Sequence, residues 1–131
     1  MSSAAFKLVF ALLLVGAIAA CARTAPIYNV SQMPVTASKP HPSLDEVGKA
    51  IMRAGTGLGW QMQPVKAGQM LGTLSVREHQ AVVDVNYSAQ SYSINYKDSA
   101  NLKYDGQTIH QNYNGWVQNL DKAIRAQLSA L

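Results

Sequence analysis

Ser99, His110 and a nearby carboxylate are the residues of this sequence whose types could together perform nucleophilic catalysis. A serine nucleophile needs a histidine to take its proton and an acid to orient that histidine, and Asp98 or Asp105 could supply the acid. Both aspartates flank expected turns, where aspartate side chains bond nearby backbone N–H groups. Turn capping is therefore their expected role, and a small hydrolase is the least favoured of the functions considered.

His79 and His110 are the histidines considered as metal ligands, and His41 is the third histidine of the chain. None of them lies at a zinc-type spacing from a cysteine or from another histidine, so we expect His79 in a turn, His110 at a helix start, and no metal. The G-x-G-x-G run from Gly55 to Gly59 follows an expected helix and precedes an expected strand. Nucleotide-binding fingerprints have the reverse order, so we expect no cofactor.

Tyrosines interleaved with Asn, Ser and Gln are concentrated in the C-terminal half of the chain. Such a composition is common on surfaces that bind glycans or peptides. Tyr87, Tyr92 and Tyr96 share the parity of the expected core residues of their strands, so we assign them to the core. Tyr104 and Tyr113 are the tyrosines of this half that remain as candidate binding residues. Asn112 and Asn114 join them, because both are poor helix formers at the start of an expected helix, and such a departure sometimes marks a functional site.

Cys21 is the single cysteine of the chain, and it follows a segment with the features of an export signal. Lys7 supplies a positive charge, the residues after it are apolar, and Ile18-Ala19-Ala20 forms a small-residue cleavage site. The uncharged run of about 13 residues is shorter than the roughly 18 to 20 that a membrane-spanning helix needs. The sequence therefore predicts a signal peptide over residues 1–20, cleaved between Ala20 and Cys21.

The string Ile18-Ala19-Ala20-Cys21 resembles the lipobox of bacterial lipoprotein precursors, which is a branched residue, two small residues and cysteine. In that family the thiol receives a diacylglycerol, the signal peptide is removed, and the new amine is usually acylated. The resemblance implies that Cys21 is lipidated, and several acyl chains anchor a protein far more firmly than one reversible chain. Ala22, rather than aspartate, follows the cysteine, which in Gram-negative lipoproteins favours the outer membrane, facing the periplasm.

Two further segments, Tyr96 to Tyr104 (YKDSANLKY) and Ile109 to Val117 (IHQNYNGWV), resemble strings in a group of small uncharacterised bacterial lipoproteins. This resemblance implies an anchored domain that faces the periplasm. It brings with it no activity and no catalytic residue.

Length and charge restrict the partners of the protein. A chain of 131 residues is too short for a multi-domain enzyme with its own cofactor fold. The formal net charge is only +4, no cluster of five to eight Lys and Arg residues occurs, and an exported chain does not normally meet nucleic acid. We therefore expect the membrane, through the lipid anchor, and an envelope protein or polymer as partners, with the oligomeric state left open.

Residues 21–42 are predicted to be the lipidated cysteine and a proline-rich tether, because they contain four prolines and no helical period. Residues 26–30 have some strand character, and whether they add an edge strand stays open. Residues 43–131 are predicted to form the domain.

The first helix of this domain is predicted from Leu44 to Ala54, after a capping box of the S-x-x-E form at Ser43 to Glu46. Alternating apolar and polar residues then predict strands over 60–65, 69–77, 81–88 and 91–97, joined by turns at 78–80 and 89–90, while 101–104 could end a further strand. An apolar stripe from Ile109 to Leu128 predicts a last helix capped by Thr108.

This order of elements predicts an α+β fold, a two-layer sandwich in which an antiparallel meander of three to four strands carries the N-terminal and C-terminal helices on one face (α-β-β-β-(β)-α). The predicted function is a membrane-anchored envelope module that binds or scaffolds through a sheet edge or the other sheet face, where we expect Asn86, Ser93 and Asn95 to point outward. The alternative is a small-ligand carrier with an apolar pocket between helices and sheet, lined by Trp60, Met62, Tyr113 and Trp116.

Overall fold

The structure is a computed structural model that describes residues 23–131. The predicted signal peptide, the cleavage between Ala20 and Cys21, and the lipidation of Cys21 therefore lie outside the described residues. Within residues 23–131, no helix is long and apolar enough to cross a membrane.

Seven strands and two helices make up the described chain. The main sheet is antiparallel and has the strand order β2-β6-β5-β4-β3. Its meander consists of β3 (Gln61–Lys66), β4 (Gln69–Val76), β5 (His79–Tyr87) and β6 (Ser91–Ala100), and β2 (Val30–Pro34) lies beside β6. A separate two-stranded sheet pairs β1 (Thr24–Pro26) with β7 (Thr108–His110), and the helices are α2 (Leu44–Gly57) and α3 (Gln111–Ser129).

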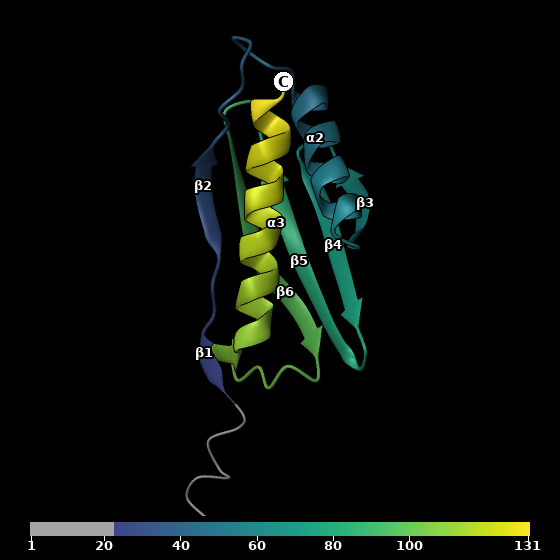
Figure 1. Cartoon of the computed structure of the whole chain (residues 1–131), viewed down its shortest axis with the longest axis vertical. Coiled ribbons are helices and arrows are strands. Elements are labelled where there is room, and N and C mark those ends of the chain that lie inside the picture. The colour runs from purple at the N-terminus through teal and green to yellow at the C-terminus, as the bar shows by residue number, and fades with distance from the viewer. Residues whose placement is uncertain (1–22) are drawn as a thin grey trace, which may run out of the picture.

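Both helices lie side by side on the same face of the main sheet (Figure 1), which confirms the predicted α+β sandwich. The alternation of β4 and β5 explains this layering, since one parity of each of these two strands is buried under the helices. Val83, Val85 and Ile94 are fully buried there, and each contributes about 1.5–3 kcal/mol relative to an exposed side chain. Tyr92 shares this face and is 1% exposed, as predicted for a core tyrosine.

The helix α2 begins at the predicted capping box and ends later than predicted. The Ser43 hydroxyl accepts a hydrogen bond from the backbone N–H of Glu46, and the Glu46 carboxylate accepts one from the backbone N–H of Ser43. Hydrogen bonds from the Lys39 ammonium and from Ser43 lower the pKa of Glu46 to about 2. The helix continues past Ala54 to Gly57, and Gly55 packs against Met62, where a Cβ atom would collide with the thioether.

The N-terminal segment is the main departure from the sequence prediction. The tether predicted over residues 21–42 is wrong for residues 24–34, because β1 pairs with β7 and β2 pairs with β6. Val30 is 3% exposed and belongs to the core. Two of the four prolines that indicated a tether, Pro26 and Pro34, are the last residues of these two strands, and strand ends on a sheet edge tolerate proline.

Three smaller predictions in the C-terminal half are also wrong. Residues 101–104 form a loop and not a strand end, and the turn between β4 and β5 lies at residues 77 and 78. Thr108 does not cap α3, because residues 108–110 pair with β1 and the Thr108 hydroxyl donates to Asp105. His110 is the N-cap instead, and its Nδ1 accepts a hydrogen bond from the backbone N–H of Asn112.

Candidate binding site

The loop between β6 and β7 is held in one shape by its own backbone and by one apolar side chain. Leu102 is 1% exposed, and its carbonyl accepts a hydrogen bond from the backbone N–H of His110 at 2.8 Å. The residues on either side of it, Asn101 and Lys103, have φ angles of 59° and 54°. Non-glycine residues rarely adopt this left-handed conformation, and here it places Leu102 inward and Lys103 in solvent.

Asp105 closes the same loop. Its carboxylate accepts hydrogen bonds from the backbone N–H groups of Gln107 at 2.9 Å and Thr108 at 2.7 Å, and from the Thr108 hydroxyl at 2.9 Å. The bonds from Thr108 and Gln107 hold the pKa of Asp105 below its usual value. Asp98 lies within β6, where its carboxylate accepts a hydrogen bond from the backbone N–H of Ser99. The turn-stabilising role is therefore confirmed for Asp105 and wrong for Asp98.

A hollow of about 400 Å³ opens beside this loop. Tyr96 and Tyr104 stack there with their ring centroids 4.0 Å apart, and the edge of Tyr96 meets Tyr113 at 5.7 Å. The Tyr96 and Ser99 hydroxyls are 2.7 Å apart and hydrogen-bonded, and burial raises the pKa of Tyr96. We refer to this feature as the Tyr104 hollow, lined by Tyr96, Lys97, Asp98, Ser99, Asn101, Leu102, Lys103 and Tyr104.

The four candidate binding residues do not form one site. Tyr104 is 41% exposed and borders the hollow, whereas Tyr113 is fully buried and presents no surface to a ligand. Asn112 is exposed at the start of α3. The Asn114 side chain accepts a hydrogen bond from the backbone N–H of Tyr28 and donates one to the Pro26 carbonyl, so Asn114 fastens the N-terminal segment to α3.

The structure also brings together two histidines that the sequence keeps 31 positions apart. The rings of His79 and His110 have centroids 6.0 Å apart, and Trp116 lies 6.5 Å from His79. His79 Nδ1 bonds to the Asn101 carbonyl at 2.7 Å, which leaves its Nε2 unprotonated in the neutral ring. His110 has the opposite tautomer, because its Nδ1 accepts an N–H. No local spacing could have indicated this pair.

The hydrolase and ligand-carrier hypotheses find little support in this geometry. Ser99 bonds to Tyr96, and His110 bonds to the backbone of α3 and not to Ser99. Two hollows of about 400 Å³, in the groove between β2 and α3 and beside Tyr104, are not lined by the residues predicted for a carrier pocket, which are Trp60, Met62, Tyr113 and Trp116. Among the described residues, no group of three or more His, Cys, Asp or Glu side chains could hold a metal ion.

The sheet face opposite the helices is uncovered. Asn86 is exposed on it and Asn95 is half-buried, whereas Ser93 is 8% exposed because its hydroxyl accepts a hydrogen bond from the backbone N–H of Gln32 in β2. The prediction that Ser93 points freely outward is therefore wrong. Asp84 and Lys97 form an ion pair on this face at 3.6 Å.

Comparison with known proteins gives no assignment. No protein-family model, no curated protein and no solved structure matches the chain.

Proposed function

We propose that the protein is a lipid-anchored module of the cell envelope, held in the outer membrane and facing the periplasm, that acts by binding an envelope protein or polymer. The observation that carries the proposal is the order of features at the N-terminus. An apolar export signal ends in Ile18-Ala19-Ala20-Cys21, and the folded domain begins at Thr24. An exported chain with one cysteine at this position has a modification site and no disulfide partner.

Binding is favoured over catalysis, because the proposed catalytic side chains are held in other hydrogen bonds and the exposed side chains form a polar surface. The histidine and the serine of the hydrolase hypothesis are occupied by separate hydrogen bonds. The uncovered face of the main sheet instead offers a broad polar surface, with Ser75, Gln80 and Asn86 exposed on β4 and β5. We place the contact with the envelope partner on this face.

The anchor is tested by the intact mass of the protein extracted from membranes. We expect the mass of residues 21–131 plus a diacylglyceryl group and an acyl group. The Cys21→Ser variant should lose this modification and stay uncleaved, because the acceptor thiol is gone. An Ala22→Ser variant, which adds a hydroxyl one residue later and retains the thiol, is the matched control. An unmodified wild-type mass in the soluble fraction would contradict the anchor.

The binding face is tested by photo-crosslinking in cells. A photoreactive residue at Ser75, Gln80 or Asn86 should give a specific adduct, because these side chains project from the uncovered face. The control is Asn119, which is exposed on α3 on the opposite side of the sheet. If none of the three positions gives an adduct, or if Asn119 gives the same one, the assignment of this face is wrong.

A further inference from the structure

We infer that the end of the domain formed by β1, the loop over residues 101–107 and the turn between β4 and β5 rests directly on the lipid headgroups of the anchoring membrane. This inference rests on the proposed lipidation of Cys21. In place of the predicted tether, one end of the domain contacts the membrane directly. The surfaces away from that end are then the ones accessible to a partner.

The length of chain between the cysteine and the fold requires this closeness. Two residues separate Cys21 from Thr24, the first residue of β1, and the three residue-to-residue steps between them span roughly 10 Å when extended. The headgroup region of one leaflet is itself roughly 5–8 Å thick. A cysteine whose acyl chains lie in the hydrocarbon therefore holds β1 at the membrane surface.

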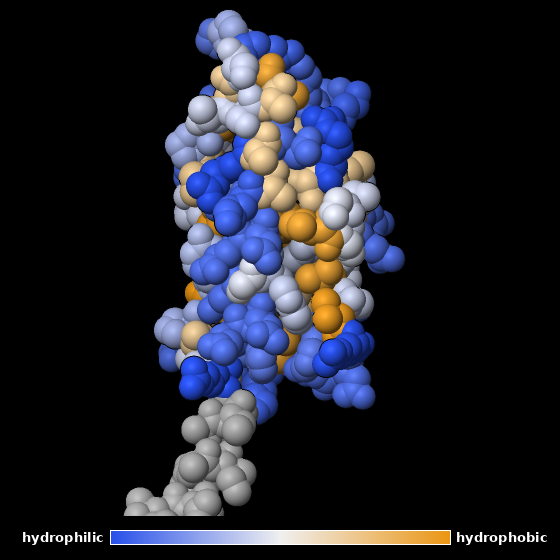
Figure 2. Space-filling model, viewed as in Figure 1, coloured by the Kyte–Doolittle hydropathy of each residue, from blue (hydrophilic) through white to orange (hydrophobic). Residues whose placement is uncertain are grey.

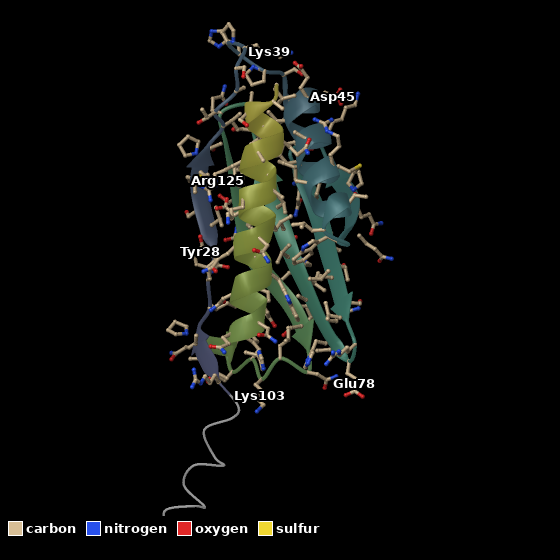
Figure 3. All side chains as sticks on the ribbon, viewed as in Figure 1. Tyr28, Lys39, Asp45, Glu78, Lys103 and Arg125 are labelled. Carbon is tan, nitrogen blue, oxygen red and sulfur yellow. The ribbon has the colours of Figure 1, made fainter. Side chains whose placement is uncertain are left out.

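Backbone pairing fixes which end faces the membrane. Thr24 pairs with His110, and the Arg23 carbonyl accepts a hydrogen bond from the backbone N–H of Gln111 at 3.3 Å. Lys103 and Glu78 lie at this end, whereas Lys39 and Asp45 lie at the opposite end (Figure 3). The chain after Arg23 is paired with the rest of the domain, so no flexible linker follows Arg23 that would let the domain present its other end to the membrane.

The surface at this end suits headgroups and not hydrocarbon. Figure 2 shows hydrophilic side chains around the end from which the N-terminal chain leaves. Tyr104 is the exposed aromatic residue of the loop, at 41%, and tyrosine is enriched where membrane meets water. Lys103, held outward by its left-handed backbone, can reach a lipid phosphate.

Charge at this end is nearly balanced, so the contact depends on the anchor. Arg23, Arg77 and Lys103 are exposed beside Glu78, Asp98 and Asp105. A surface with equal numbers of both signs gains little from an anionic membrane, in contrast to a polybasic segment. We therefore expect contact in the lipidated protein and no binding of the unlipidated domain to vesicles.

The single cysteine makes this inference directly testable. In the lipidated protein the Cys21 thiol is blocked, so a Lys103→Cys or a Lys39→Cys variant has one free thiol for a fluorophore. The lipidated variants are inserted into vesicles of phosphatidylethanolamine and phosphatidylglycerol that contain a headgroup-nitroxide lipid. We expect severalfold stronger quenching at position 103 than at position 39, a matched pair of exposed loop lysines at opposite ends of the domain.

Gln107→Cys, on the same loop as Lys103, provides a second membrane-facing position in case one label disturbs the fold. Equal or absent quenching at positions 103, 107 and 39, in protein whose mass includes the acyl groups, would overturn the contact and leave the anchor standing. A mass without acyl groups would overturn the proposed function and the contact together.

Discussion

A chain that begins at residue 35 is expected to be less stable than residues 23–131 by about 4 kcal/mol or more, because it lacks β1 and β2. Val30 alone, at 3% exposure, contributes about 1.5–3 kcal/mol of burial. Removing β2 also unpairs one side of β6. In a domain of this size each kcal/mol shifts the melting temperature by about 4–8 °C, so thermal unfolding of the two chains should differ by at least about 15 °C.

A single substitution gives a milder test of the same contact. Asn114→Ala removes both hydrogen bonds to the N-terminal segment, at about 0.5–1.5 kcal/mol each. Asn112→Ala is the matched control, because Asn112 is exposed, lies in the same helix start and undergoes the same change in helix propensity. If the shortened chain melts at the same temperature as residues 23–131, and the two asparagine variants are equally stable, residues 24–34 are a tether after all.

Stability is expected to fall steeply above pH 10. Burial, together with a hydrogen bond to Asp121, raises the pKa of Tyr92 well above its usual value, and burial does the same for the pKa of Tyr113. Above pH 10 the unfolded chain releases protons that the folded chain retains, so folding is disfavoured as the pH rises. Each tyrosine then contributes about 1.4 kcal/mol per pH unit, which amounts to about 2.7 kcal/mol per unit for the two.

The measurement is the free energy of unfolding in urea between pH 8 and pH 12, for the wild type and for Tyr92→Phe, Tyr113→Phe and the double variant. Each single substitution should reduce the decrease in unfolding free energy above pH 10 by about 1.4 kcal/mol per pH unit. Below pH 9 the effects of the single variants on stability should differ in sign. Tyr92→Phe removes the donor to Oδ1 of the buried Asp121, whose Oδ2 remains paired with Arg125, whereas Tyr113→Phe removes a buried hydroxyl that makes no hydrogen bond in the described chain. A double variant with the wild-type slope would contradict this assignment.

Most of the sandwich was predictable because its signals are local. The capping box at Ser43 and the alternation of β4, β5 and β6 lie within single segments, and each gave an element close to the observed one. The N-terminal strands carry no such signal. Their prolines resemble those of a tether, and only the free edge of β6 and the β7 segment, whose paired residues lie 57 to 86 positions later, make β1 and β2 into strands.

The candidate site was predictable only in part. Tyr104 was selected because it lies outside the regular alternation, and it does border the hollow. Tyr113 was selected by the same reasoning and is buried, because the aromatic cluster with Tyr96 covers it. The proximity of His79 and His110 depends on the turn before β5 and on β7 meeting at one end of the molecule, which no spacing in the sequence expresses.

The course of the N-terminal strands also determines how the domain would bear mechanical load. β1 and β2 follow one another along one long edge of the molecule, starting at the end proposed to face the membrane (Figure 1). A force between the proposed anchor and the proposed envelope partner would act along these strands, so the ladder hydrogen bonds to β7 and β6 would be sheared together. A strand pulled crosswise would lose them one at a time. The segment nearest the proposed anchor would therefore resist extraction under such a force, because its ladder hydrogen bonds would have to break together.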